Sequence, residues 1–232
     1  MLELALEALK TYDWGTDPKV LLPIDEAVVT TYGNAGARQD LEAKLAACLT
    51  TGVSRDAKDY VCRKLMVIGT AESVPTLAGL LTDKDLSHMA RYALERIPAT
   101  EAAQALRDGL AKVSGATQVG VIGSLGVRRD TASVPALAAL LNNADASVAR
   151  AAAIALGDIG TAEAAKALTD GKPTAPEAKQ AATDASLACA EDLLASGKKA
   201  EALAVYKSLV GDGQPKQVRL AVTRGMVACA GK

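Results

Sequence analysis

The sequence ASVPALAALL at residues 132–141 nearly repeats ESVPTLAGLL at residues 72–81, and this repetition decides the fold. A column of leucines recurs with a matching period, at intervals of 29, 31, 31 and 31 residues: Leu65, Leu94, Leu125, Leu156 and Leu187. Twelve residues after each of the first four comes another leucine: Leu77, Leu106, Leu137 and Leu168. Two columns that share one period indicate tandem copies of a structural unit.

Each copy contains two predicted helices. Apolar side chains recur at i, i+3 and i+4, and short polar turns such as TDKD at residues 82–85 separate the segments. Pro75 and Pro135 fall in the first turn of a helix, where a missing N–H is harmless, and Ser73 and Ser133 are predicted N-caps. A pair of helices cannot bury its own apolar face, so neighbouring copies must stack on it.

The composition agrees with an all-α fold. Half of the chain is apolar, but there is no Phe and only one Trp, so Ala, Leu and Val must build the core through close helix packing. The net charge of −1 and the pI near 5.9 argue against a nucleic-acid partner, which would favour a basic surface. No apolar run is long enough to predict a membrane span.

The stretch SVPALAALLNNADASVARAAAIALGDIGTAEAAKAL at residues 133–168 resembles the HEAT repeat, in the bacterial variety also called PBS-lyase HEAT-like. Residues 71–99 resemble it as well, and LLASGKKAEALAVYKSLV at residues 193–210 is similar to a TPR helix pair. The resemblance implies a right-handed α-α superhelix, a HEAT-like solenoid whose second helices lie side by side along a concave face.

The expected domain organisation follows from the period. Residues 1–40 lack the repeat and are predicted to form an N-terminal helical cap, and residues 41–232 form the HEAT-like array of about six helix pairs. In the fifth unit, GKPTAPEAK at residues 171–179 predicts a longer loop between the two helices. The predicted units are residues 41–70, 71–99, 100–130, 131–160, 161–197 and 198–232.

A binding surface is predicted from the register of the second helices. In the fourth unit one face carries the apolar core positions, and the same register identifies the outward positions of the other units. These positions are charged and polar in the first two units and apolar beyond them. Two simpler readings stay open: the small and apolar residues could only permit tight packing, and the charges could only pair with one another. The predicted binding residues are Asp59, Arg63, His88, Arg91, Tyr92, Glu95, Val119, Ile122 and Arg150.

Few residues suggest chemistry. His88 is the only histidine, which excludes a metal site of several imidazoles and the di-iron centre of the HEAT-repeat hydroxylases. The sequence has no phosphate-binding glycine motif and no nucleophile elbow. One open hypothesis is that Cys62, His88 and Asp59 converge as a nucleophilic or metal site. No enzyme activity and no cofactor are predicted.

The sequence therefore predicts a non-enzymatic scaffold that binds a protein or peptide through its concave face. One alternative resembles the bilin lyases, as an accessory subunit that holds a tetrapyrrole. Another is a segment of a larger protein, because VACAGK at residues 227–232 stops at a helix end without a polar cap. We expect a monomer or weak oligomerisation through that end. The compartment stays open between the cytoplasm and export after removal of an upstream signal.

Overall fold

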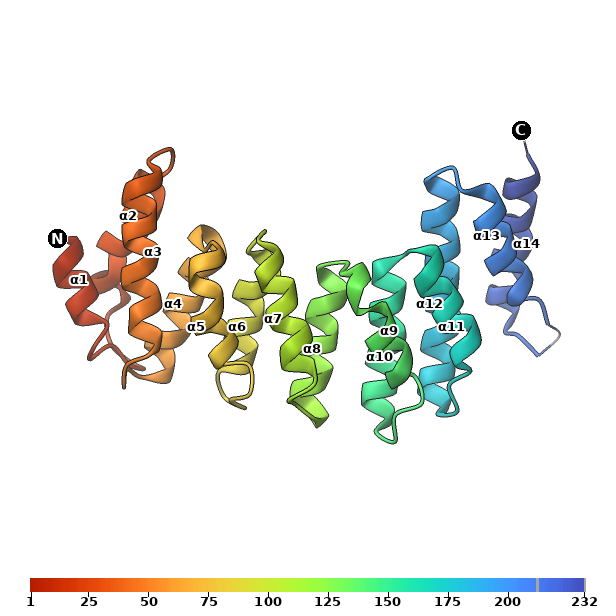
Figure 1. Ribbon diagram of the computed structural model, residues 1–232, viewed down its shortest axis with the longest axis horizontal. Coiled ribbons are helices and arrows are strands. Elements are labelled where there is room, and N and C mark those ends of the chain that lie inside the picture. The colour runs from red at the N-terminus through yellow and green to blue at the C-terminus, as the bar shows by residue number, and fades with distance from the viewer. Residues whose placement is uncertain (212, 232) are drawn as a thin grey trace. The chain divides into compact units, whose positions relative to one another are not determined.

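The computed structural model describes residues 1–211 and 213–231, so the last residue of the predicted open end lies outside the described residues. The chain divides into two compact units, Met1–Val113 and Ser114–Lys232. Throughout the described residues the regular structure is helical, without a β-strand, and the helices alternate in antiparallel pairs (Figure 1). This confirms the predicted all-α fold. No helix in the described part is long and apolar enough to cross a membrane.

The first unit contains two layers of helices. The second helices α4 and α6 lie side by side, and α3, α5 and α7 pack in sequence on the other layer. The elements of this unit are α1 (Leu2–Ala8), η1 (Pro18–Leu21), α2 (Leu22–Thr30), α3 (Ala35–Leu49), α4 (Arg55–Ile68), η2 (Ala71–Ser73), α5 (Val74–Gly79), α6 (Ser87–Arg96) and α7 (Thr100–Leu110).

Tyr60 and Lys64 of α4 contact the N-terminal elements. The Tyr60 hydroxyl lies 2.8 Å from the Asp25 carboxylate and 3.2 Å from the Leu21 carbonyl oxygen. The Lys64 ammonium pairs with Asp25 at 2.6 Å and lies 4.5 Å from the centre of the Tyr60 ring. Burial, followed by the Asp25 carboxylate, raises the pKa of Tyr60 well above its usual range, so the phenol stays protonated and can donate. Helix α3 begins at Ala35 because the Asn34 side chain accepts the Ala37 N–H.

The second unit repeats the two-layer arrangement. Its second helices α8, α10 and α12 pack side by side, and α9 and α11 form the other layer. The elements are α8 (Gly115–Val127), η3 (Thr131–Ser133), α9 (Val134–Leu140), α10 (Ala146–Ile159), α11 (Ala162–Gly171), α12 (Pro176–Ala195), α13 (Lys199–Ser208) and α14 (Lys216–Ala230).

The longer loop predicted at residues 171–179 is wrong. Helix α11 ends at Gly171 and α12 begins at Pro176, so the connection is short and α12 itself is the long element, with 20 residues. Pro176 occupies the first turn of α12, where no intrahelical partner is needed for the missing N–H. Lys172 turns the chain with a left-handed backbone, φ 41°.

The predicted leucine columns form the core. Leu65, Leu94, Leu125 and Leu156 are fully buried, whereas Leu187 is only half-buried. Leucines of the second column, Leu77, Leu106, Leu137 and Leu168, are buried too. The repeat therefore places its largest aliphatic side chains between the two layers of each unit.

Ser73 and Ser133 occupy the N-cap positions of α5 and α9, as predicted, but their side chains form no capping hydrogen bond. Ser73 and Ser133 lie in short 3-10 turns and donate their hydroxyls back to the carbonyl oxygens of Thr70 and Asp130. The buried Glu42 of α3 takes over part of the capping role. Its carboxylate accepts the Thr70 N–H at 2.7 Å and the Ser73 N–H at 3.2 Å, and it also bonds to the Thr70 hydroxyl. One carboxylate thus joins two successive helix pairs.

Candidate functional site

A cleft of about 260 Å³ lies between α4 and α6 in the first unit. The second helices of two consecutive repeats form the walls of the cleft, and each helix contributes residues at helical spacing along its wall. The cleft is lined by Asp59, Cys62, Arg63, Met66, His88, Met89 and Tyr92. Four of these, Asp59, Arg63, His88 and Tyr92, are predicted binding residues, and the structure brings them together.

The rim of the cleft is polar and internally paired. On α4, the Arg63 Nε lies 2.9 Å from the Asp59 carboxylate, one helical turn away. On α6, the Arg91 Nη2 lies 3.3 Å from the His88 Nδ1, which accepts because a guanidinium has only donors. The rings of His88 and Tyr92 meet edge to face, 4.5 Å apart. These contacts hold the rim side chains in position before any partner arrives.

The floor of the cleft is apolar and soft. Cys62 and Met89 are buried, and Met66 is half-buried. Methionine side chains have three rotatable bonds and a polarisable sulfur, so they adapt to a variety of apolar groups. The sequence does not single out Met89, because the register of α6 assigns it to the core; its place directly after His88 is the one available signal.

The cleft does bring together Cys62, His88 and Asp59. The protonation of the thiol and the pairing of the other two side chains do not favour nucleophilic chemistry. Burial, followed by the Asp59 charge, raises the pKa of the Cys62 thiol to about 12, whereas a nucleophilic cysteine needs a lowered pKa. Asp59 is engaged by Arg63, and His88 by Arg91. Among the described residues, no group of three His, Cys, Asp or Glu side chains is placed to hold a metal ion.

Arg91 and Glu95 lie on α6 beside the cleft and are half-buried rather than part of its lining. Burial lowers the pKa of the Arg91 guanidinium, and the Glu95 carboxylate opposes this effect. Arg91 therefore acts on the cleft through His88, which it orients.

The remaining predicted residues belong to the second unit. The assignment of Ile122 to an exposed binding surface is wrong, because its side chain is 0% exposed. A Cβ on Gly126 would lie 3.0 Å from the Cα of Ala155, so α8 approaches α10 closely and Ile122 is enclosed. Val119 is half-buried, and Arg150 is exposed on α10. On α8, Gly126 permits close packing against α10, whereas a methyl group on Gly123 would meet nothing within 4 Å.

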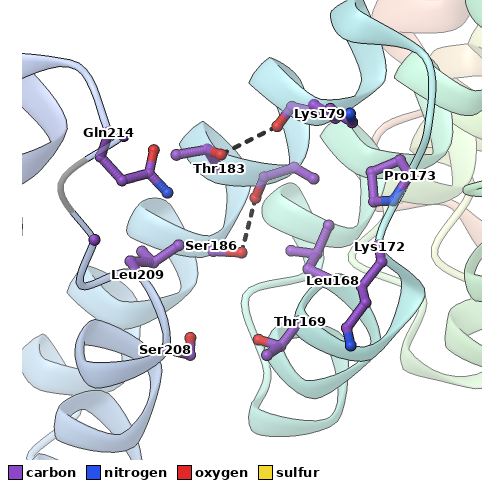
Figure 2. A pocket seen from close by; sticks show the side chains of 13 residues that line it. Leu168, Thr169, Lys172, Pro173, Lys179, Thr183, Ser186, Ser208, Leu209 and Gln214 are labelled. Atoms are coloured by element: carbon purple, nitrogen blue, oxygen red, sulfur yellow. Dashed lines mark hydrogen bonds between the residues drawn. The ribbon is translucent and has the colours of Figure 1, made fainter.

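A larger hollow of about 540 Å³ lies in the second unit between α11, α12 and α13 (Figure 2). Its serine and threonine hydroxyls are engaged within their own helix: Thr183 donates to the Lys179 carbonyl oxygen and Ser186 to that of Ala182. Apart from Lys172, Lys179 and Gln214, the hollow offers few groups that could orient a ligand. We therefore place the candidate site at the α4–α6 cleft.

The stacked antiparallel helix pairs define an all-α repeat protein. More narrowly, the family model described as HEAT repeats matches residues 110–186, so this part of the chain is similar to HEAT repeats. The match includes residues 133–168 and confirms the resemblance found there. The fold is HEAT-like.

Solved structures similar to this chain include two engineered proteins and an enzyme. One engineered protein has a TM-score of 0.48 and 21% identity, over 99% of this chain and 68% of its own. A second has a TM-score of 0.42 and 18% identity, over 97% of this chain and 96% of its own. Human deoxyhypusine hydroxylase in complex with glycerol has a TM-score of 0.40 and 17% identity, over 99% of this chain and 96% of its own. No curated protein matches the chain.

Proposed function

We propose that this protein is a non-enzymatic binding module that recognises a peptide or protein segment at the α4–α6 cleft. The observation that carries the proposal is the convergence of Asp59, Arg63, His88 and Tyr92 around one cavity. These residues come from two different repeats, and the register of the second helices alone selects them. A rigid pair of helices with a polar rim and an apolar floor is typical of a recognition surface.

The size of the cleft favours one anchoring side chain. Its volume of about 260 Å³ is below the range of about 300–1,000 Å³ that is usual for sites of whole small ligands. Tyr92 is 51% exposed and Met66 half-buried, so an apolar side chain of a partner would gain contact with both. The Arg63 side chain is largely exposed and can exchange Asp59 for a carboxylate of the partner.

Selection from a displayed peptide library on the immobilised protein tests the proposal. Selected peptides are then titrated against Arg63→Glu and Tyr92→Ala variants, each of which we expect to weaken binding about tenfold or more. Arg55→Glu on the same helix and Tyr32→Ala are matched controls, since both residues are exposed outside the cleft. Equal affinities for cleft and control variants would overturn the assigned site.

Three points stay predictions: that the protein holds a tetrapyrrole, that it is a segment of a larger protein, and that it is a monomer or a weak oligomer. The compartment stays open. Addition of bilin or haem to the protein, followed by absorbance, tests the first. Light scattering tests oligomerisation through the C-terminal end.

A further inference from the structure

A second groove, of about 610 Å³, runs between α10 and α12 in the second unit. The two helices run in the same direction: Gly157 lies against Ala185, and Gly160 lies against Asp192 farther along both. The groove is lined by Arg150, Ile154, Gly157, Asp158, Pro176, Glu177, Gln180, Ala181, Asp184, Ala185 and Ala188.

The floor of this groove is apolar, and its residues are small. A Cβ on Gly157 would lie 2.8 Å from the Ala185 Cβ, so the helices touch at this point and leave a trough above it. Ile154 is 39% exposed beside the trough. On α12 the lining extends from Pro176 to Ala188, which at 1.5 Å per residue is roughly 18 Å. That length suits a peptide segment rather than a single side chain.

The charged residues of the groove are predominantly acidic. Asp158, Glu177 and Asp184 outnumber Arg150, the one basic residue of the lining. Within the described residues, Asp158 and Glu177 have no ion pair, and Asp184 only accepts hydrogen bonds from Gln180. Burial raises the pKa of Asp158, and the nearby Arg129 opposes this effect. A cation placed in the groove would compensate these carboxylates, whereas phosphate groups would be repelled.

We propose that the α10–α12 groove binds a lysine- or arginine-bearing peptide segment of a partner protein, with small or aliphatic residues of that segment against the Gly157 floor. Charge complementarity and the length of the groove select this partner. The inference rests on the proposed function only in that both concern peptide recognition. The helices, the unit and the partner chemistry are different.

A labelled peptide of about twelve residues, built from Lys-Ala-Ala-Leu repeats, is a suitable probe, and its twin with Glu in place of Lys is the charge control. Fluorescence anisotropy with the full chain measures both dissociation constants. We expect the lysine peptide to bind and the glutamate peptide to bind at least about tenfold more weakly. Absence of measurable binding of the lysine peptide, or equal binding of the twins, would overturn the proposal.

Charge-reversal variants locate the site. Glu177→Lys/Asp184→Lys should weaken binding of the lysine peptide about tenfold. Glu191→Lys/Glu201→Lys carries the same change in net charge at exposed positions outside the groove and should change it by less than about twofold. An equal loss in both double variants would mean general electrostatic attraction and would refute the groove.

A steric pair of variants separates shape from charge. Ala188→Phe fills the groove and should reduce affinity about tenfold, whereas Ala195→Phe places the same ring on an exposed position of α12 outside it. Circular dichroism confirms that both variants fold. Unchanged binding to the Ala188→Phe variant would contradict the proposal. Arg63→Glu should leave the lysine peptide unaffected, so failure at one site is distinguishable from failure at the other.

Discussion

The Cys62 thiol at the floor of the α4–α6 cleft makes the free energy of unfolding depend on pH in the alkaline range. Burial and the Asp59 charge raise its pKa from the ordinary value of 9.0 to about 12. The unfolded chain therefore loses this proton above about pH 9, while the folded protein keeps it until about pH 12. Because the unfolded state binds fewer protons in this window, the free energy of unfolding falls as the pH rises through it. Below pH 9.0 the group adds no pH dependence.

We predict that a Cys62→Ala variant loses less stability at high pH than the wild type. At about pH 10 the difference in this loss should be about 1 kcal/mol, since one group with a displaced pKa contributes about 1.4 kcal/mol per pH unit. Urea unfolding of both proteins at about pH 8 and about pH 10 measures it. Parallel pH profiles would show that the folded state does not hold the thiol protonated.

At the scale of elements, the close approach of α10 to α12 depends on Gly157. An added methyl group would lie 2.8 Å from the Ala185 Cβ and 3.0 Å from its Cα, and backbone cannot move away cheaply. Gly123 lies in the interior of α8, and a methyl group there would meet nothing within 4 Å. The two glycines therefore occupy similar helical positions with opposite surroundings.

We predict that Gly157→Ala destabilises the protein and Gly123→Ala stabilises it. Overpacking costs about 1–3 kcal/mol and outweighs the gain in helix propensity of about 1 kcal/mol, whereas only the gain applies at Gly123. Urea unfolding of the three proteins gives the comparison. Stabilisation by both substitutions would mean that the helices are not in close contact at Gly157.

The pairing of helices was predictable from the sequence because the two columns of periodic leucines mark the buried positions of each helix pair. The exposed positions were less predictable. Applied to α4 and α6, which are amphipathic, the register of α10 selected the cleft residues Arg63 and Tyr92. It failed for α8, which has no charged residue to mark an exposed face, and Ile122 is buried there. The prediction of a longer loop before α12 was wrong because a proline such as Pro176 marks the start of a helix as readily as a break.

On the scale of the whole molecule, the protein divides into two compact units, and within each unit a helix packs mainly against its partner in the pair and against helices of the adjacent pair. Stability in such arrays is close to a sum of local terms. The buried Glu42 makes one such local contribution to stability, because its carboxylate accepts hydrogen bonds from the Thr70 and Ser73 N–H groups of the next repeat. Its removal leaves these donors without their acceptor.

We predict that Glu42→Ala costs the first unit about 2–3 kcal/mol and leaves the second unit unchanged. Amide hydrogen exchange read by mass spectrometry should show faster exchange in residues 35–79 and unchanged exchange in residues 134–195. Glu42→Gln keeps one acceptor oxygen and should have a smaller effect. Equal loss of protection in both units would indicate that the chain unfolds as a single cooperative body.

The neighbour-only stacking of helix pairs within each unit also has a mechanical consequence. Tension on the ends of a unit would detach its outermost pair first, because few contacts reach beyond the adjacent pair. Each released segment of about thirty residues would lengthen the chain by roughly 100 Å when fully extended. A stretched unit would thus extend in small successive steps, one helix pair at a time. It would recover its length as each pair packs back onto its neighbour.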